Sequence, residues 1–146
     1  FIAALTHIAT RFIDDKRNEK IRIYIESIDN LLGVITAQLS KNSNLKALIR
    51  STNFKCDMYQ KATANIEGDI NDLQLRMDNT TDFVGKNLIT QTANVIAEGS
   101  SKNSIQVASK LVLESSGKAE TNLYGNATIE IKRFADESSL NKKLLK

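Results

Sequence analysis

Cys56 and His7 are the only thiol and the only imidazole in the chain, so they form the one available nucleophile and base pair for covalent catalysis. The apolar pattern described below predicts that Cys56 lies level with Ile28 of a neighbouring helix. About 21 residues of helix, or roughly 30 Å, would then separate Cys56 from His7. We therefore expect no catalytic residue. We interpret Cys56 as a buried, inert side chain, with an interchain disulfide as the alternative.

Metal chemistry would have to depend on carboxylates, because one His and one Cys do not make a site by themselves. Asp69, Asp72, Asp78 and Asp82 lie close together in sequence. Read as a calcium loop starting at Asp78, this stretch lacks the Gly at the sixth position and the Glu at the twelfth that such a loop requires. The six glycines are isolated and form no phosphate-binding loop. The sequence predicts no metal site and no cofactor.

Two triplets match the acceptor pattern for N-glycosylation, beginning at Asn79 and Asn126. Such triplets also arise by chance in a chain this rich in Asn, Ser and Thr. We retain both asparagines as candidate glycosylation sites in a secreted or extracellular protein.

The C-terminal residues 141–146, with the sequence NKKLLK, combine three lysines with two leucines. They could dock on an anionic membrane or on a protein partner. The alternative is that these cations stabilise the C-terminus of a helix by interacting with its dipole, and we favour that alternative.

Composition limits the kind of protein that could position these residues. A chain of 146 residues is long enough for one domain with a real core, and we treat residues 1–146 as a single domain. Proline is absent, which permits long helices. No apolar run approaches the roughly 18 residues of a transmembrane helix. A net charge of +3 is too small to indicate a nucleic-acid partner. The chain begins at Phe1, so we expect a processed protein or a fragment.

Two apolar series with alternating spacings of three and four residues are the main indication of fold. If the chain reverses at residues 41–44, facing residues of an antiparallel helical hairpin should have numbers that add to 84, as Leu39 and Leu45 or Ile35 and Ile49 do. Such a narrow apolar stripe is typical of helices that pack on a partner helix. The two series are Ile21-Ile25-Ile28-Leu32-Ile35-Leu39 and Leu45-Ile49-Thr52-Cys56-Tyr59-Thr63-Ile66-Ile70-Leu73-Met77.

The sequence therefore predicts an all-α protein: an elongated antiparallel helical bundle or coiled-coil hairpin of three to four long helices. The expected segments are residues 2–40, 45–98 with a kink or turn at 78–82, and 105–145. Strict alternation at residues 21–25 and 129–131 is the strand period. It favours β-structure locally, and we leave a short β element or a disordered tail open for the last segment.

This fold predicts a non-enzymatic structural or interaction protein, secreted or part of an assembly, that associates with itself or with a protein partner. The alternative is an amphipathic helical bundle that binds or carries lipid, for which a lipid surface would be the partner. A third interpretation is a helical piece of a larger assembly. No resemblance to a known family supports a more specific function.

Overall fold

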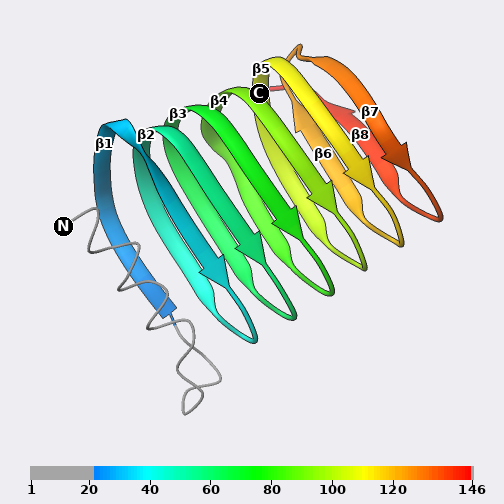
Figure 1. The fold of residues 1–146 in the computed structure, drawn as a ribbon, viewed down its shortest axis with the longest axis horizontal. Coiled ribbons are helices and arrows are strands. Elements are labelled where there is room, and N and C mark those ends of the chain that lie inside the picture. Colours follow the sequence, from blue (N-terminus) through cyan, green and yellow to red (C-terminus); the bar gives the residue numbers. More distant parts are fainter. Residues whose placement is uncertain (1–21, 146) are drawn as a thin grey trace.

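The computed structural model describes the backbone of residues 22–145 and the side chains of residues 34–145. All regular elements in this range are β-strands (Figure 1). They are β1 (Arg22–Leu39), β2 (Asn44–Met58), β3 (Thr63–Met77), β4 (Asp82–Ala97), β5 (Lys102–Ser115), β6 (Glu120–Tyr124), β7 (Thr128–Phe134) and β8 (Ser139–Lys143).

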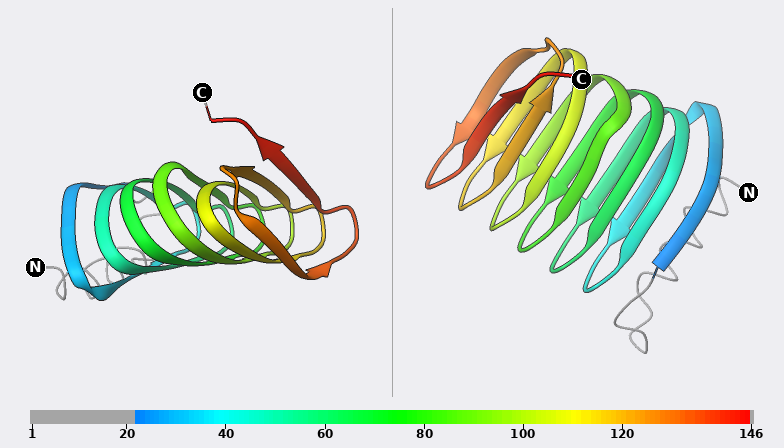
Figure 2. Two further views of the ribbon diagram at one scale, coloured as in Figure 1. Left: turned by 90° about the horizontal axis from the view of Figure 1, so that it is seen from above. Right: turned by 180° about the vertical axis from the view of Figure 1, so that it is seen from behind.

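The strands pair in parallel, and each new coil of the chain lies directly beside the preceding one. The hydrogen-bonded order is β1-β2-β3-β4-β5-β6-β8, and β7 pairs with β5. Leu39 pairs with Met58, and Met58 with Met77, so the repeat here is 19 residues. Figures 1 and 2 show the coils stacked along one axis in sequence order. Such stacking of short repeats defines a β-solenoid.

Each coil has two limbs that face each other across the core. In β2, for example, residues 44–50 form the first limb and residues 53–58 the second, with a bend between them. In the coil after β5 the two limbs are separate strands: β6 is the first limb and β7 is the second. One edge of the solenoid therefore consists of bends and the other of the turns that join successive coils. We call them the bend edge and the turn edge.

The core consists of rows of inward side chains in register from coil to coil. Strand residues alternate between the two faces of a sheet, so every second residue of a limb points inward. In the second limbs of β1 to β5, all the inward side chains are at most 4% exposed. The rows are Ile35-Phe54-Leu73-Ala93-Leu111, Ala37-Cys56-Leu75-Val95-Leu113 and Leu39-Met58-Met77-Ala97-Ser115.

The turn edge repeats one backbone conformation. Each turn has one residue with φ between 59° and 73°, in the left-handed region, and the turns bond to one another through main-chain groups. The amide of Thr80, for example, donates to the carbonyl of Gln60 at 2.9 Å, and that of Ser100 to Asn79 at 2.9 Å. The left-handed residues are Lys41, Gln60, Asn79, Gly99, Gly117 and Asp136.

The bend edge is less regular. The pairing shifts between Asn65 and Gly68, and again between Gly85 and Ile89. Gly68 has φ +125°, and a Cβ atom there would overlap the carbonyl oxygen of Ile49 in the neighbouring coil. Only glycine fits this position. Length variation between coils is thus absorbed at the bends.

The prediction of an all-α bundle was wrong, as were the coiled-coil hairpin and its helical segments. Residues 45–98 and 105–145 form strands and turns. In the cluster at residues 78–82, residues 78–81 form the turn between β3 and β4, and Asp82 begins β4. The strand-like alternation at 129–131 was the correct local indication, since these residues belong to β7. Residues 2–21 of the first predicted helix lie outside the described residues.

The helical spacing was a consequence of the bend. In β3, Ile66 and Ile70 are inward residues of the first limb, whereas Leu73 and Met77 are inward residues of the second. The step across the bend, from Ile70 to Leu73, is three residues. Selecting only the large apolar side chains gives steps of four, three and four, which imitates a helix.

The rule that facing residues have numbers adding to 84 was wrong for a related reason. The chain does turn at residues 41–43, but the strands on either side are parallel neighbours. Leu39 therefore pairs with Met58 and Ile35 with Phe54, at a constant difference in residue number rather than a constant sum.

Candidate binding surfaces

Cys56 lies in the core with no exposed surface, and burial, followed by the charge of Asp57, raises the pKa of its thiol. A thiol held in this neutral state is a poor nucleophile. His7 lies outside the described residues. The interchain disulfide stays a prediction, and it would require the Cys56 sulfur to leave the core.

The four clustered aspartates are separated by the fold. Asp69 pairs with Arg50 near the end of the first limb of β3, and Asp72 lies on the outer face of the second limb. Asp78 belongs to the turn edge and Asp82 to the first limb of β4. Among the side chains that the structure describes, those of residues 34–145, no group of three or more His, Cys, Asp or Glu could hold a metal ion.

Both candidate glycosylation sites are on the surface. Asn79 is an exposed left-handed residue of the turn edge, and Asn126 is exposed between β6 and β7. Their amide groups are therefore accessible, although Thr81, the third residue of the first triplet, is 1% exposed. Glycosylation itself stays a prediction.

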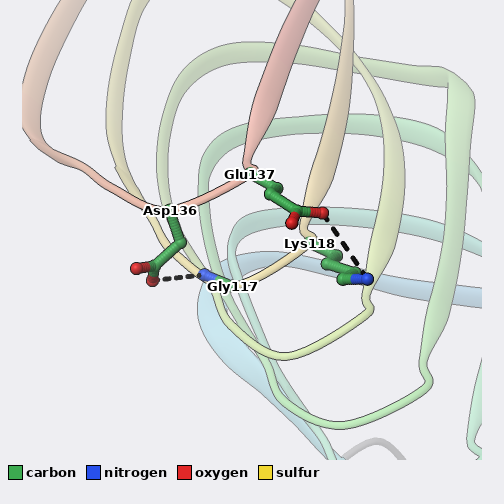
Figure 3. Close-up of polar contacts among 4 residues, drawn as sticks. All are labelled: Gly117, Lys118, Asp136 and Glu137. Atoms are coloured by element: carbon green, nitrogen blue, oxygen red, sulfur yellow. Dashed lines mark hydrogen bonds and ion pairs between the residues drawn. The ribbon is translucent and has the colours of Figure 1, made fainter.

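The turn edge is stabilised by its own side chains (Figure 3). The carboxylate Oδ2 of Asp136 accepts a hydrogen bond from the amide of Gly117 at 2.9 Å. Lys118 and Glu137, one position further along the same turns, form an ion pair at 3.5 Å. Both pairs join adjacent turns, so these residues have a structural role in register.

The outer face of the second limbs is the candidate binding surface with the richest chemistry. Its side chains form three parallel rows, because equivalent residues of adjacent strands lie about 4.8 Å apart. We call this surface the second-limb face. The rows are Asn53-Asp72-Thr92-Lys110-Thr128, Lys55-Gln74-Asn94-Val112-Glu130 and Asp57-Arg76-Ile96-Glu114-Arg133.

A shallow hollow of about 370 Å³ lies on the second-limb face between β2 and β5. Its lining combines both charges, amides and a few apolar groups. The lining side chains include Lys55, Asp57, Tyr59, Gln74, Arg76, Asn94, Ile96, Val112 and Glu114.

Contacts along the rows hold the rim of this surface in place. Thr92 donates a hydrogen bond to Asp72 Oδ1 of the adjacent strand. Lys110 Nζ lies 2.6 Å from Glu130 Oε2, and the hydrogen bond and charge of Lys110 lower the pKa of the Glu130 carboxyl. These side chains join neighbouring strands, so the face presents an ordered polar pattern.

One family model matches this chain over residues 11–127, and its description is "Putative auto-transporter adhesin, head GIN domain". The chain belongs to this family. The match includes β1 to β6 and so spans the strands that line the hollow of the second-limb face, whereas β7 lies beyond it. No curated protein and no solved structure matches the chain.

The second-limb face was missed by the sequence analysis because its residues were assigned to helices. The signal that would have found it is polar residues alternating with apolar ones, repeated at about 19 residues. The strands also remove the functions that required helices: association through helix packing and a helical lipid carrier are both wrong. No helix long and apolar enough to cross a membrane occurs among the described residues.

Proposed function

We propose that this chain is a non-enzymatic adhesive domain, exposed outside the cell, that binds a protein partner through the second-limb face. The description of its family supports an adhesive role and a location at the surface. The two candidate glycosylation sites, Asn79 and Asn126, agree with that location because both are exposed.

The observation that supports the binding surface most directly is the hollow between β2 and β5. It is open to solvent on one side, it displays Arg76 beside Ile96 with amides around them, and it spans four strands of a continuous sheet. Arginine and bulky apolar side chains supply much of the affinity at protein interfaces, whereas surrounding polar groups define register.

Proteins of the extracellular matrix are suitable first probes. The chain would be immobilised, and its binding to laminin, fibronectin and collagen measured by biolayer interferometry against albumin as a blank. We expect binding to at least one of these proteins. Replacing Arg76 and Ile96 together by Ala should weaken that binding at least about tenfold, because both side chains line the hollow.

A matched control exists on the outer face of the first limbs. Lys46 is an exposed cation on β2 and Val84 a half-buried branched side chain on β4, so the double change to Ala there removes similar groups. The control should bind as the original chain does. Equal loss in both variants, or binding no stronger than to albumin, would contradict the proposal.

A further inference from the structure

A second hollow, of about 510 Å³, lies on the opposite side of the solenoid near the C-terminal coils. It is separate from the second-limb face, since its walls come from first limbs and from the residues after β8. Lys86 and Asn87 of β4, Tyr124 of β6, and Lys142 and Lys143 of β8 line it, together with Leu144 and Leu145. We call it the lysine hollow.

The fold brings these side chains together from distant parts of the sequence. Tyr124 and Lys143 are neighbours because β6 and β8 pair in parallel, and the side chain of Asn141 donates to that of Asn122 at 3.4 Å across the same pair. Lys86, two coils earlier, belongs to the same side of the sheet. A cluster of three cations thus forms, in which Lys86 joins the two lysines of the C-terminal segment, Lys142 and Lys143.

The strand structure removes the explanation that the sequence favoured for the C-terminal lysines. A helix dipole would have accounted for cations at residues 142–146, but Lys142 and Lys143 belong to a β-strand, and strands have almost no net dipole. Among residues 34–145, no carboxylate forms an ion pair with Lys86, Lys142 or Lys143. No acidic side chain lines the hollow. The positive charge is therefore left for a ligand.

We propose that the lysine hollow binds an acidic polysaccharide, one whose sugar rings bear carboxylate or sulfate groups. The three ammonium groups match the anions of such a polymer. The half-buried ring of Tyr124 and the exposed Leu144, at 88%, supply apolar surface for the C–H faces of a sugar ring, and Asn87 can bond its hydroxyl groups. The volume is in the range of small-ligand sites, roughly 300–1,000 Å³.

A polysaccharide explains this combination better than a membrane does. A lipid surface is bound by a broad apolar face bordered by cations. Here the apolar groups are only one ring and two leucines, Tyr124, Leu144 and Leu145, which are too few to form such a broad face. A linear polymer can instead enter an open hollow and continue along the row of strands.

Isothermal titration calorimetry at low salt would test the proposal with polygalacturonate, which carries only carboxylates, and with heparin, which also carries sulfates. Neutral dextran is the blank. We expect binding to at least one acidic polymer, none to dextran, and weakening as the salt concentration rises. The difference between the two polymers identifies which anion is preferred.

The decisive variant replaces Lys142 and Lys143 together by Gln, and its control replaces Lys46 and Lys61 by Gln. Both double variants remove two exposed positive charges, but Lys46 and Lys61 lie outside the hollow. The first should weaken polymer binding at least tenfold, and the control less than twofold. Replacing Tyr124 by Phe should preserve binding, whereas Ala should reduce it.

Three results would overturn the proposal. Equal weakening in both lysine doubles would mean that net charge alone attracts the polymer. Absence of binding to both acidic polymers would remove the ligand class. Binding to phosphatidylglycerol vesicles without binding to either polymer would assign the hollow to a membrane surface. The variant with Ala at Arg76 and Ile96 should bind the polymers normally, so failure here is distinguishable from failure of the protein-binding proposal.

Discussion

Two regions of the solenoid contribute to the same inward rows: the coils formed by β3, β4 and β5, and the coil formed by β6 and β7. They differ in how far their inward side chains are shielded from water. Val95 and Leu113 are at most 1% exposed, whereas Ile131, next in that row, is 50% exposed. Phe134 continues the row of Ala97 and Ser115 and is 46% exposed. Figure 2 shows β7 at the outer side of the stack.

The difference shows where a solenoid gets its stability. A residue in a middle coil packs on equivalent residues of two neighbouring coils, whereas β7 pairs only with β5 among the described residues. Stability in such a structure is approximately a sum of terms for each coil and for each contact between adjacent coils. The same kind of side chain should therefore contribute more in β4 than in β7.

The largest expected effect tests this difference with two phenylalanines. Phe83 of β4 has no exposed surface, and its replacement by Ala should lower the free energy of unfolding by about 3–5 kcal/mol. The same change at Phe134 should cost about 1 kcal/mol, because water already reaches half of that ring. Urea unfolding followed by circular dichroism measures both. Similar losses at the two sites would contradict the comparison.

A second test contrasts the two edges within the middle coils. Replacing Gly68 by Ala should cost about 3 kcal/mol, since the new Cβ overlaps the carbonyl oxygen of Ile49 at a φ that only glycine adopts readily. Replacing Gly99 by Asn should cost less than the change at Gly68: Asn79 already has this left-handed conformation in the adjacent turn, and a Cβ at Gly99 would approach the Asn79 amide nitrogen to 2.7 Å, a milder overlap than at Gly68. A more harmful change at Gly99 would show that the turns, not the bends, limit the fold.

Hydrogen exchange should reveal the same difference without mutation. Those amides of β7 that bond to β5 should exchange at least about 100-fold faster than amides of β4 that bond to β3, because local opening is easiest where few buried contacts must break. Mass spectrometry of peptides from residues 82–97 and 128–134 measures this. Equal protection would mean that the coil formed by β6 and β7 is as stable as the middle of the solenoid.

The sequence could have predicted part of this fold. Phe54, Cys56 and Met58 alternate with polar residues, and the gap expected between residues 98 and 105 contains the turn between β4 and β5. The absence of proline, by contrast, permits a solenoid as well as a long helix. The interpretation was wrong because it took only large apolar residues as core residues. Ala64, which is small, and Asn103 and Ser115, which are polar, also occupy core positions.

Asn103 illustrates why the rest could not be predicted. Its side chain is fully buried next to Phe83 in the same row, and its amide donates to Thr121 Oγ1 at 3.0 Å. The Oδ1 atom of Asn103 is buried without a hydrogen-bond partner. A buried amide whose hydrogen-bond partner lies 18 positions away is recognised only once the register is known. The lysine hollow has the same origin, since Lys86 meets Lys143 only through the pairing of coils.

The smallest expected effect is the change in stability when a carboxylate is neutralised, and it has opposite signs in β4 and β7. On β4, burial raises the pKa of the Asp82 carboxyl; Lys102 on the next strand lowers it, and Glu120 beyond raises it. On β7, Lys110 lowers the pKa of Glu130. A raised pKa means that ionisation of Asp82 opposes folding. Its favourable contribution is complete below the unfolded value of about 3.9 and is lost as the pH rises through the folded pKa.

Replacing Asp82 by Asn should therefore raise the thermal midpoint at pH 7, by the equivalent of less than about 1 kcal/mol, and have no effect near pH 3. Replacing Glu130 by Gln should lower the midpoint at pH 7, because the ionised carboxylate is the stabilising form, and this loss should vanish as the pH falls through the folded pKa of Glu130. Thermal unfolding at both pH values measures the two signs. If both variants shifted the thermal midpoint at pH 7 in the same direction, the proposed difference between the carboxylates of β4 and β7 would be contradicted.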